Sequence, residues 1–309
     1  MSDSNHPGSM NNNTMSGLFG KIIRGVGGIY YVHVPGRGLF ACRARGIFRK
    51  RKVKPLPGDN VRMDITDIGD MEGNISEILP RVNTIIRPAA ANVDQAMIIF
   101  AADHPAPNFN LLDRFLLLME RQSVETIICF NKADLVSRKE MEEICQIYAG
   151  SGCRVLSCSV RHREGLDQVR GVLSGRTTIV AGPSGVGKSS LTNAVYPEAA
   201  MQTGSISEKI GRGRHTTRHT ELFAIGEDTY LMDTPGFSTI YIEGLEKEDL
   251  KYLYPEFEPY INSCRFAGCN HLSEPGCLVK EKVAGGEISQ VRYENYRLIF
   301  EELAARKPY

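Results

Sequence analysis

Short alternating or β-branched runs, separated by glycine and proline, predict two regions of sheet in this chain. In the first region, residues 28–34, 39–45 and 59–65 alternate between apolar and polar side chains or are rich in strand-forming residues. Several short strands within about sixty residues are typical of a small barrel. An OB-fold is the best candidate for this N-terminal part.

The second region consists of more continuous apolar runs. Residues 126–130, 153–156, 177–181 and 229–232 are strand-like, and the first and third are rich in β-branched side chains. Runs of this length and composition favour buried strands. Between residues 287 and 303, apolar residues recur near helical spacing, which predicts a C-terminal helix.

A glycine-rich loop follows the strand predicted at residues 177–181. Its sequence, G-P-S-G-V-G-K-S, has the spacing of a phosphate-binding loop, in which backbone N–H groups and a helix N-terminus face phosphate oxygens. We expect Lys188 to reach the β- and γ-phosphates and Ser189 to bind Mg²⁺. The alternative is a chance match in a turn, against which the Lys-Ser ending and the preceding strand both weigh. The predicted contacts are Gly182, Pro183, Ser184, Gly185, Val186, Gly187, Lys188, Ser189 and Ser190.

A motif typical of guanine recognition lies upstream of this loop. The residues N-K-A-D end the apolar run 126–130, and their aspartate can accept hydrogen bonds from the N1–H and the amino group of guanine. Adenine lacks this donor pair, so GTP is preferred to ATP. Alone, the four residues would be explained better as a strand-ending turn, but a short S-C-S loop follows the next strand, where a second base-contacting loop is expected. The predicted base contacts are Asn131, Lys132, Ala133, Asp134, Ser157, Cys158 and Ser159.

Two further segments supply the expected switch regions. Asp233 follows the strand at residues 229–232, and the N–H of Gly236 can approach a γ-phosphate. Residues 211–218, G-R-G-R-H-T-T-R, form a basic stretch with adjacent hydroxyls, where Thr217, or alternatively Thr216, is the expected switch threonine. The predicted Mg²⁺ ligands are Ser189, Thr217 and Asp233.

The order of these motifs is rotated. The base-reading motifs precede the phosphate loop and the switches, whereas a GTPase ordinarily begins with the phosphate loop. A parallel sheet tolerates such a rotation when the original termini lie close together at the surface. Because the second switch now leads directly into the C-terminal part, we expect the nucleotide state to be transmitted to that part.

A cluster of soft metal ligands lies near the C-terminus. Three cysteines and one histidine have the spacing C-x4-C-x-H-x5-C in a loop that contains glycine and proline. This is the ligand set of a closed tetrahedral Zn²⁺ site, and four protein ligands leave no open position, so we expect a structural zinc. The alternative is that the cysteines are separate buried residues, since the spacing is not the commonest one. The predicted ligands are Cys264, Cys269, His271 and Cys277.

A strongly basic stretch lies within the predicted barrel. Seven basic residues and no acidic residue occur between Cys42 and Lys54. With Tyr30, Tyr31 or Phe48 available to stack on bases, this stretch predicts a salt-sensitive, largely sequence-independent RNA contact. The alternatives are a solvated edge whose charges prevent strand pairing, and aromatic residues that belong to the barrel core. The predicted RNA contacts are Arg43, Arg45, Arg49, Lys50, Arg51, Lys52 and Lys54.

Charge and composition limit these interpretations. The 309 residues have a formal net charge of only +1, so the basicity is local, and this length predicts two or three domains. No apolar stretch approaches the roughly 20 residues that cross a bilayer, and the polar N-terminus lacks a signal-peptide core. We therefore expect a soluble cytoplasmic protein without a membrane partner, in which the eight cysteines are reduced thiols. The basic residues near the C-terminus, Arg292, Arg297, Arg306 and Lys307, fit an RNA surface and an ordinary solvated helix face equally well.

The rotated order, the segments G-R-H-T-T and D-T-P-G-F, and the Cys/His cluster together resemble the ribosome small subunit-dependent GTPase A family, from about Lys21 to the C-terminus. The resemblance implies a multidomain fold: an N-terminal OB-fold β-barrel, a central α/β P-loop GTPase domain with circularly permuted motif order, and a mainly helical C-terminal zinc-binding domain. The expected boundaries are a disordered leader at 1–18, the RNA-binding barrel at 19–84, the GTPase domain at 85–241 and the zinc-binding domain at 242–309.

The resemblance also implies a function and a set of partners. The family is a late-stage assembly factor that binds the small ribosomal subunit and its rRNA in the GTP form and leaves after hydrolysis that the subunit stimulates. GTP and GDP, Mg²⁺ and one structural Zn²⁺ are the expected ligands, and a monomer suffices. Two alternatives remain: a zinc- and RNA-binding module with a passive guanine-nucleotide switch, and a GTPase that acts on another RNA or ribonucleoprotein.

The group that orients the attacking water is not evident from the motifs. Phe237 occupies the position where Ras-like enzymes place a glutamine, and a phenyl ring cannot orient water. His215 in the first switch is the local candidate, and an RNA-contacting or merely mobile histidine is the alternative. The residues expected to act in catalysis are His215, Lys188 and Thr217.

Overall fold

The computed structural model describes residues 15–44, 54–86, 88–197, 220–233 and 244–306. The chain forms two compact units, one made of Met1–Val93 with Arg218–Asp228 and the other of Asp94–Thr217 with Thr229–Tyr309. The finer domain boundaries that the sequence suggests, at residues 84/85 and 241/242, remain predictions.

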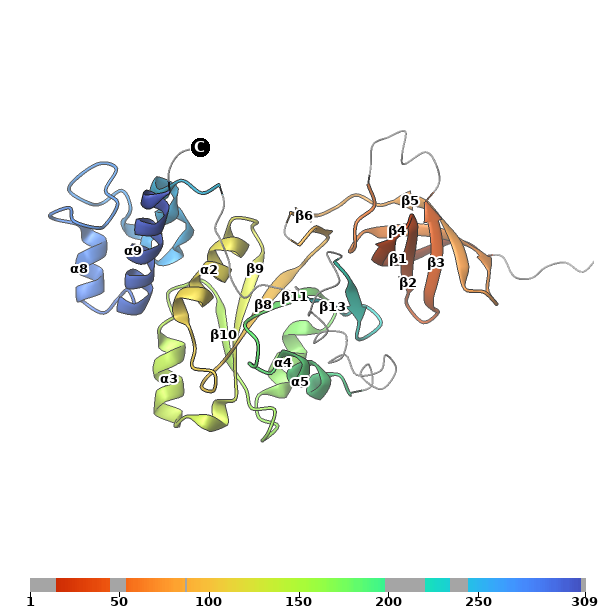
Figure 1. The fold of residues 1–309 in the computed structure, drawn as a ribbon, viewed down its shortest axis with the longest axis horizontal. Coiled ribbons are helices and arrows are strands. Elements are labelled where there is room, and N and C mark those ends of the chain that lie inside the picture. Colours follow the sequence, from red (N-terminus) through yellow and green to blue (C-terminus); the bar gives the residue numbers. More distant parts are fainter. Residues whose placement is uncertain (1–14, 45–53, 87, 198–219, 234–243, 307–309) are drawn as a thin grey trace, which may run out of the picture. The chain divides into compact units, whose positions relative to one another are not determined.

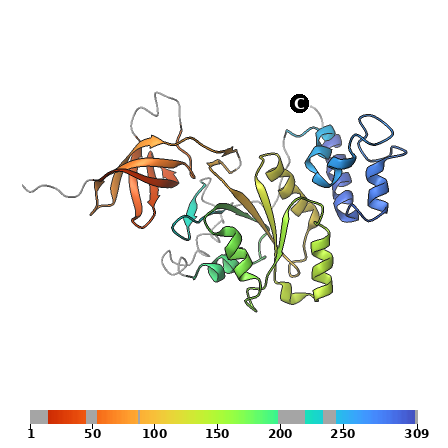
Figure 2. The ribbon, with the colours of Figure 1, turned by 180° about the vertical axis from the view of Figure 1, so that it is seen from behind.

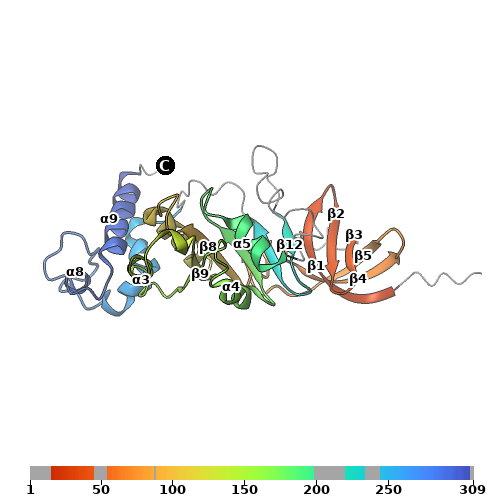
Figure 3. The same cartoon turned by 90° about the horizontal axis from the view of Figure 1, so that it is seen from below.

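The first unit is built around a five-stranded barrel. Its strands are β1 (Met15–Val26), β2 (Ile29–Val34), β3 (Gly38–Ala44), β4 (Asn60–Asp67) and β5 (Glu72–Ile78). They close in the order β1-β2-β3-β5-β4, with β3 and β5 parallel and the other neighbours antiparallel (Figures 1 and 3). A closed five-stranded barrel with this crossover is the arrangement of the OB-fold, as predicted.

Alternating side chains fill the barrel. Ile22, Val32, Phe40, Val61 and Ile75 are buried in one cluster, and along β4 the buried positions alternate with more exposed ones. This alternation is the period of two that strands impose on their side chains, and it explains why the sequence pattern predicted these strands.

Two tight contacts hold the connection that leads into β4. Gly58 has φ +90, and a Cβ atom there would lie 1.9 Å from the carbonyl oxygen of Ala91, so only glycine fits. The carboxylate of Asp59 is fully buried and accepts bonds of 2.6 and 2.8 Å from the guanidinium of Arg81. The first unit also contains the short strands β6 (Thr84–Ile85) and β7 (Ala90–Ala91), which pair with each other, and β12 (Leu222–Ala224).

The second unit contains a parallel sheet. Its strands β8 (Gln95–Ala101), β9 (Glu125–Asn131), β10 (Arg154–Ser157), β11 (Thr177–Ala181) and β13 (Tyr230–Asp233) lie in the order β10-β9-β8-β11-β13. Each is parallel to its neighbour. Strands β8 and β11 are buried along their whole length, as central strands covered by helices on both faces must be.

Helices connect and cover these strands. They are α2 (Phe109–Glu120), α3 (Arg138–Gln146), α4 (Leu166–Leu173) and α5 (Lys188–Val195), with a single 3-10 turn, η1 (Ala133–Leu135), after β9. The green helices α4 and α5 lie side by side in Figure 2, and Arg170 of α4 donates to the carbonyl of Val195 at the end of α5.

The C-terminal segment forms a helical cluster within the same unit. It consists of the 3-10 helices η2 (Lys247–Leu253) and η3 (Pro255–Tyr260), a long loop, and the helices α8 (Leu278–Ala284) and α9 (Gln290–Ala305). An aromatic core joins them, in which Tyr254 stacks on Phe257 and both rings meet Tyr296 of α9 edge to face. Leu117 of α2 belongs to the same core, so this cluster packs directly on the GTPase sheet's helix.

A buried ionic network adds to the contact between α9 and α2. Arg292 is 1% exposed and donates to Asp113 of α2 at 2.7 Å and to Glu256 of η3 at 2.7 and 3.1 Å. Burial alone opposes its charge, but the two carboxylates raise the pKa of Arg292 well above its ordinary value, so it is charged. Arg292 is therefore neither part of a solvated face nor an RNA contact, and its sequence-based grouping with Arg297 and Arg306 was wrong.

Two further expectations can be compared with the described residues. All eight cysteines lie in described segments, and all are free thiols. In the described parts of the chain, none of the helices combines the length and the apolarity that spanning a bilayer requires.

Candidate functional site

The predicted nucleotide-binding segments all follow strands of the parallel sheet. The N-K-A-D motif ends β9, the S-C-S loop ends β10 and the glycine-rich loop follows β11. The carboxyl ends of parallel strands lie along one edge of a sheet, which is where α/β proteins bind ligands. The chain thus gathers the segments at one edge although they are far apart in sequence.

The glycine-rich loop is held tightly against the sheet. Gly182 has φ +143, and a Cβ atom there would lie 2.0 Å from the carbonyl oxygen of Ile99 in β8. Gly187 has φ +90 and precedes the first residue of α5, Lys188. The Lys188 ammonium donates to the carbonyls of Gly182 and Pro183 at 2.8 and 2.7 Å, so it lies within the loop that would surround a phosphate.

Two side chains of the N-K-A-D motif join the phosphate loop to the base-reading loop. The Asn131 amide donates to the carbonyl of Val186 at 2.9 Å, and a Cβ atom on Gly187 would lie 2.5 Å from that amide nitrogen. The Lys132 ammonium donates to the carbonyl of Gly185 at 2.8 Å and to that of His104. Neither link was predicted from the sequence. The signal that was available is that two polar side chains follow a buried strand, where they need hydrogen-bond partners on neighbouring loops.

The S-C-S loop positions the predicted guanine-reading carboxylate. The Ser159 hydroxyl donates to Asp134 at 2.5 Å and accepts from the backbone N–H of His162 at 3.1 Å. This bond from Ser159 is the main cause that lowers the pKa of Asp134 below its ordinary value, which keeps the carboxylate ionised as a hydrogen-bond acceptor. Backbone bonds between Cys158 and both Phe130 and Ala133 fix the two loops side by side.

The other predicted nucleotide residues are placed less completely. Asp233 ends β13, where its backbone pairs with Val180 of β11 in the register of the sheet. Ser189 and Ser190 lie in the first turn of α5. His215, Thr216, Thr217 and Gly236 lie outside the described residues.

Of the predicted RNA contacts, likewise, some lie within the described residues and others lie outside them. Arg43 is exposed on β3, and Lys54 is exposed just before the turn at Gly58. Tyr31 is half-buried, with the guanidinium of Arg24 4.1 Å from its ring centre. The remaining predicted residues, Arg45, Arg49, Lys50, Arg51 and Lys52, together with Phe48, lie outside the described residues.

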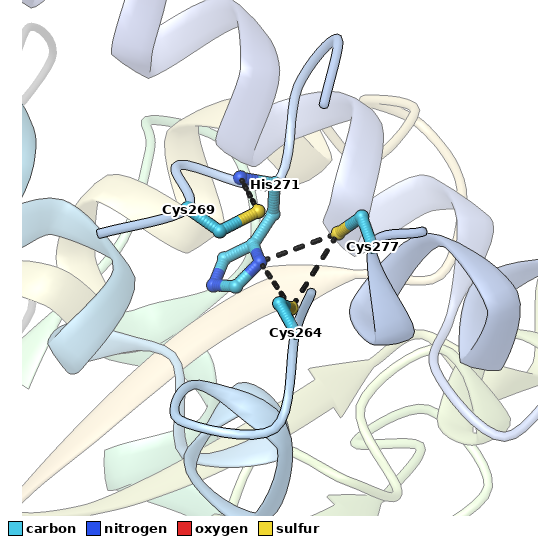
Figure 4. Close-up of side chains that lie close together, drawn as sticks. All are labelled: Cys264, Cys269, His271 and Cys277. Carbon is cyan, nitrogen blue, oxygen red and sulfur yellow. Dashed lines mark hydrogen bonds between the residues drawn. The ribbon is translucent and has the colours of Figure 1, made fainter. Parts of the chain in front are cut away.

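The four predicted metal ligands lie together in the C-terminal cluster (Figure 4). Their ligand atoms are all within 4.8 Å of one another. The Cys264 and Cys277 sulfurs are 3.9 Å apart, and His271 Nδ1 lies 3.6 Å from Cys264 Sγ and 3.4 Å from Cys277 Sγ.

These distances test whether the residues fit a metal. Around a tetrahedral zinc with Zn–S of about 2.3 Å and Zn–N of about 2.0–2.1 Å, sulfurs are about 3.8 Å apart and sulfur and nitrogen about 3.6 Å apart. The three separations among Cys264, His271 and Cys277, 3.9, 3.6 and 3.4 Å, are close to these edges. Burial, with a smaller contribution from Lys251, lowers the pKa of His271 to about 4, so its imidazole is neutral at pH 7 and can act as a ligand. The donor set therefore fits Zn²⁺.

Polar contacts to its backbone hold the loop that carries these ligands. Two tyrosines of α9 donate to it, Tyr293 to the carbonyl of His271 at 2.8 Å and Tyr296 to that of Asn270 at 2.7 Å. The Glu274 carboxylate accepts from the N–H groups of Asn270 and Leu272 at 2.7 and 2.8 Å. Such supporting bonds orient metal ligands before the metal arrives.

Comparison with known families agrees with this architecture. The family described as RsgA GTPase matches residues 78–243, and the family described as RsgA N-terminal domain matches residues 19–75. Together the two matched ranges contain the barrel, the base-reading motifs and the phosphate loop.

Full-length relatives are also similar. A small ribosomal subunit biogenesis GTPase RsgA from Agathobacter rectalis is 52% identical over 302 residues, covering 94% of this chain and 100% of that protein. A protein of the same name from Alkaliphilus metalliredigens is 44% identical over 290 residues, covering 94% and 99%.

Two solved structures share the fold. The crystal structure of YjeQ from Thermotoga maritima has a TM-score of 0.76 at 33% identity, over 94% of this chain and 99% of that one. The structure of YloQ, described as a circularly permuted GTPase, has a TM-score of 0.74 at 35% identity, over 98% and 100%. The chain therefore belongs to the RsgA GTPase family, and it is a GTP hydrolase.

Proposed function

We propose that this GTPase acts in the biogenesis of the small ribosomal subunit: it binds the subunit in the GTP form, and hydrolysis stimulated by the subunit releases it. The observation that supports this most is the direct bond from Asn131 of the base-reading motif to Val186 of the phosphate loop. It makes one continuous site from segments that read guanine and hold phosphates. The relatives from Agathobacter rectalis and Alkaliphilus metalliredigens, which are small ribosomal subunit biogenesis GTPases, suggest the ribosomal partner.

Within this site each predicted residue has a distinct role. Asp134 accepts hydrogen bonds from guanine, and the backbone N–H groups of the phosphate loop and Lys188 contact the phosphates. Ser189, Asp233 and Thr217 are the ligands for Mg²⁺, which neutralises phosphate charge during transfer. These roles are supported by the parallel arrangement of β9, β11 and β13, whose carboxyl ends lie along the same edge of the sheet.

We further propose that His215 orients the attacking water in the complex with the subunit. Phe237 follows the D-x-x-G segment and has no polar atom for this purpose. The variant His215→Ala is expected to lose stimulated hydrolysis and to keep the affinity for GTP. Stimulated hydrolysis that survives in this variant would show that His215 has another role.

The outer parts of the chain have supporting roles in this proposal. Zn²⁺ bound by Cys264, Cys269, His271 and Cys277 holds the C-terminal loop in a closed structural site. The basic stretch that begins at Arg43 contacts rRNA phosphates, which gives affinity without sequence preference.

The proposal is tested by measuring GTP hydrolysis by the protein alone, with small subunits, with large subunits and with free rRNA, at fixed Mg²⁺ and salt. We expect strong stimulation by small subunits alone. Equal, slow rates in all four reactions would favour a passive switch, and equal stimulation by free rRNA would favour a GTPase that acts on RNA more generally.

A further inference from the structure

A buried lysine lies beside the Cys/His cluster and has no role in the site as described so far. Lys251 is in η2 and is only 5% exposed. Lysine is almost never fully buried unless its charge is paired, because removing an ammonium group from water costs several kcal/mol. Its surroundings should therefore contain a negative charge.

Among the described residues, the Lys251 ammonium forms no ion pair with a carboxylate. The Lys251 ammonium instead donates to the backbone carbonyl of Cys269 at 3.0 Å. The Tyr252 ring centre is 5.3 Å away, a contact that does not neutralise a charge. This hydrogen bond places the ammonium beside a member of the Cys/His cluster, whose thiolates can carry negative charge.

The charge of that cluster depends on what it binds. Three thiolates and a neutral imidazole around a divalent cation leave one net negative charge. We propose that Lys251 is the counter-charge of the metal centre: its ammonium, fixed on the carbonyl of Cys269, balances the one negative charge of a loaded Cys₃His site. This inference rests on the zinc binding proposed above, and it assigns Lys251 as a positioning residue and not as a ligand.

Two other charged side chains near the cluster, Glu274 and Lys280, do not supply this balance. The carboxylate of Glu274 is occupied by the N–H groups of Asn270 and Leu272, and its charge has the same sign as that of the loaded cluster. Lys280 donates to the backbone carbonyl of Glu274 at 3.3 Å and is only half-buried. Among the described residues, Lys251 is therefore the buried cation that donates a hydrogen bond to a predicted metal ligand, Cys269.

Three substitutions separate charge from hydrogen bonding and packing. Lys251→Gln removes the charge and keeps a donor for the Cys269 carbonyl, Lys251→Met removes both, and Lys251→Arg keeps the charge. Lys247→Met is the matched control, because Lys247 lies on the same helix and pairs with Glu248 at 3.8 Å, a contact outside the cluster. All are made in the full-length protein.

The measurement is competition for zinc between the protein and a chromogenic chelator at pH 7.5, which gives both the affinity and the rate of transfer, together with the visible absorption of the Co²⁺-substituted protein. For Lys251→Gln and Lys251→Met we expect zinc affinity to fall about ten- to a hundred-fold, the range found when supporting residues around a metal are removed. Lys251→Arg should restore most of the affinity, and Lys247→Met should match the wild type.

Urea unfolding with and without zinc gives an independent test, which can be applied even to a variant that is less stable than the wild type. With zinc, Lys251→Gln should unfold at lower urea than the wild type. Without zinc, it should unfold at the same or higher urea, because the wild type then buries an unbalanced ammonium. Equal destabilisation in both conditions would show that Lys251 only packs, and would overturn the proposal.

The outcomes distinguish this inference from the zinc proposal. Wild-type protein that neither retains zinc nor gives the absorption of tetrahedral Co²⁺ thiolate would overturn both. Wild-type protein that binds zinc, with Lys251→Gln releasing it at the same rate, would overturn the role of Lys251 alone.

Discussion

At the scale of single residues, Ser159 is the side chain that positions Asp134, the predicted guanine-reading carboxylate. Its hydroxyl both donates to the Asp134 carboxylate and accepts from a backbone N–H, so the carboxylate has a defined direction and a lowered pKa. We therefore expect this hydroxyl to support guanine recognition through Asp134.

We predict that Ser159→Ala weakens GDP binding about five-fold, the equivalent of one hydrogen bond of about 1 kcal/mol. Because the pKa of Asp134 rises when this bond is lost, the decline of affinity on acidification should begin at a higher pH than in the wild type. Fluorescent-nucleotide titration between pH 7 and pH 4, a range chosen to include the ordinary aspartate pKa, measures both effects.

The control for this prediction is Ser137→Ala. Ser137 caps α3 by accepting from the N–H of Glu140, so its loss should cost about 1 kcal/mol of stability and leave the nucleotide affinity unchanged. An unchanged affinity in Ser159→Ala would show that Asp134 needs no support from this hydroxyl.

A second residue-scale effect concerns Glu302 of α9. Its carboxylate accepts from Arg114 of α2, and this bond is the main cause that lowers the pKa of Glu302. A lowered carboxylate pKa stabilises the folded state above the ordinary value of 4.5, and this stabilisation is lost as the pH falls through the lowered value.

Glu302→Gln is therefore expected to reduce the free energy of unfolding at pH 7, and the difference from the wild type should shrink as the pH falls below 4.5. Urea unfolding at a series of pH values measures this. Arg114→Met should give the same profile, and a difference that stays constant with pH would contradict the ionic contribution.

Some residue roles followed from the sequence and others did not. The glycine-rich loop and the Cys/His spacing each have a local pattern, so their ligand sets could be proposed from sequence alone. Arg292 and Lys251 look like surface charges in a linear sequence, because their burial depends on partners distant in the chain, such as Asp113. A signal was present for Arg292, which lies four residues before Tyr296 and seven before Ile299 and so falls on the apolar stripe of its helix.

At the scale of elements, α9 bonds both to α2 and to the loop that carries the predicted metal ligands. Arg292 and Asn295 contact Asp113 of α2, whereas Tyr293 and Tyr296 donate to the loop that carries the metal ligands. Neighbouring residues of α9 thus bond to different structures, so α2 and the loop that carries the Cys/His cluster are both fixed to the same helix.

We predict that Arg292→Met destabilises the protein by about 3–5 kcal/mol, because it leaves two buried carboxylates without their cation. Equilibrium urea unfolding measures the loss. Arg297→Met on the exposed face of the same helix, where the pair with Glu301 is solvated, should cost no more than about 1 kcal/mol. A loss of similar size in both variants would mean that the buried network contributes little.

At the scale of the whole molecule, the fold class predicted from the sequence is confirmed: a five-stranded barrel, a parallel GTPase sheet in rotated order and a helical Cys/His region. Alternating positions identified the barrel strands and continuous apolar runs identified the sheet, since each pattern is local. The link between α9 and α2 could not be predicted, because it depends on side chains 179 positions apart.

The barrel surface gives a prediction that tests the proposed RNA contact. Replacing Arg43 and Lys54, both exposed, by glutamine should weaken binding to small subunits and leave unstimulated GTP hydrolysis unchanged. Because two phosphate contacts would be lost, the slope of log affinity against log salt concentration should become shallower by about one to two.

Filter binding at 50–200 mM salt, the range over which phosphate contacts change affinity strongly, gives this slope. The control is Arg138→Gln, an equally exposed arginine on α3 whose ion pair with Glu142 is local. An unchanged slope in the double variant would place the RNA contact elsewhere.

The strand order has one more consequence, for the way the protein is made. Strand β8 lies between β9 and β11, yet β9 and β10 precede β11 in the chain. During translation from the N-terminus, β8, β9 and β10 leave the ribosome first, with one edge of β8 still unpaired. The growing polypeptide carries its guanine-reading motif early, but it cannot hold a nucleotide until synthesis has passed Ser189.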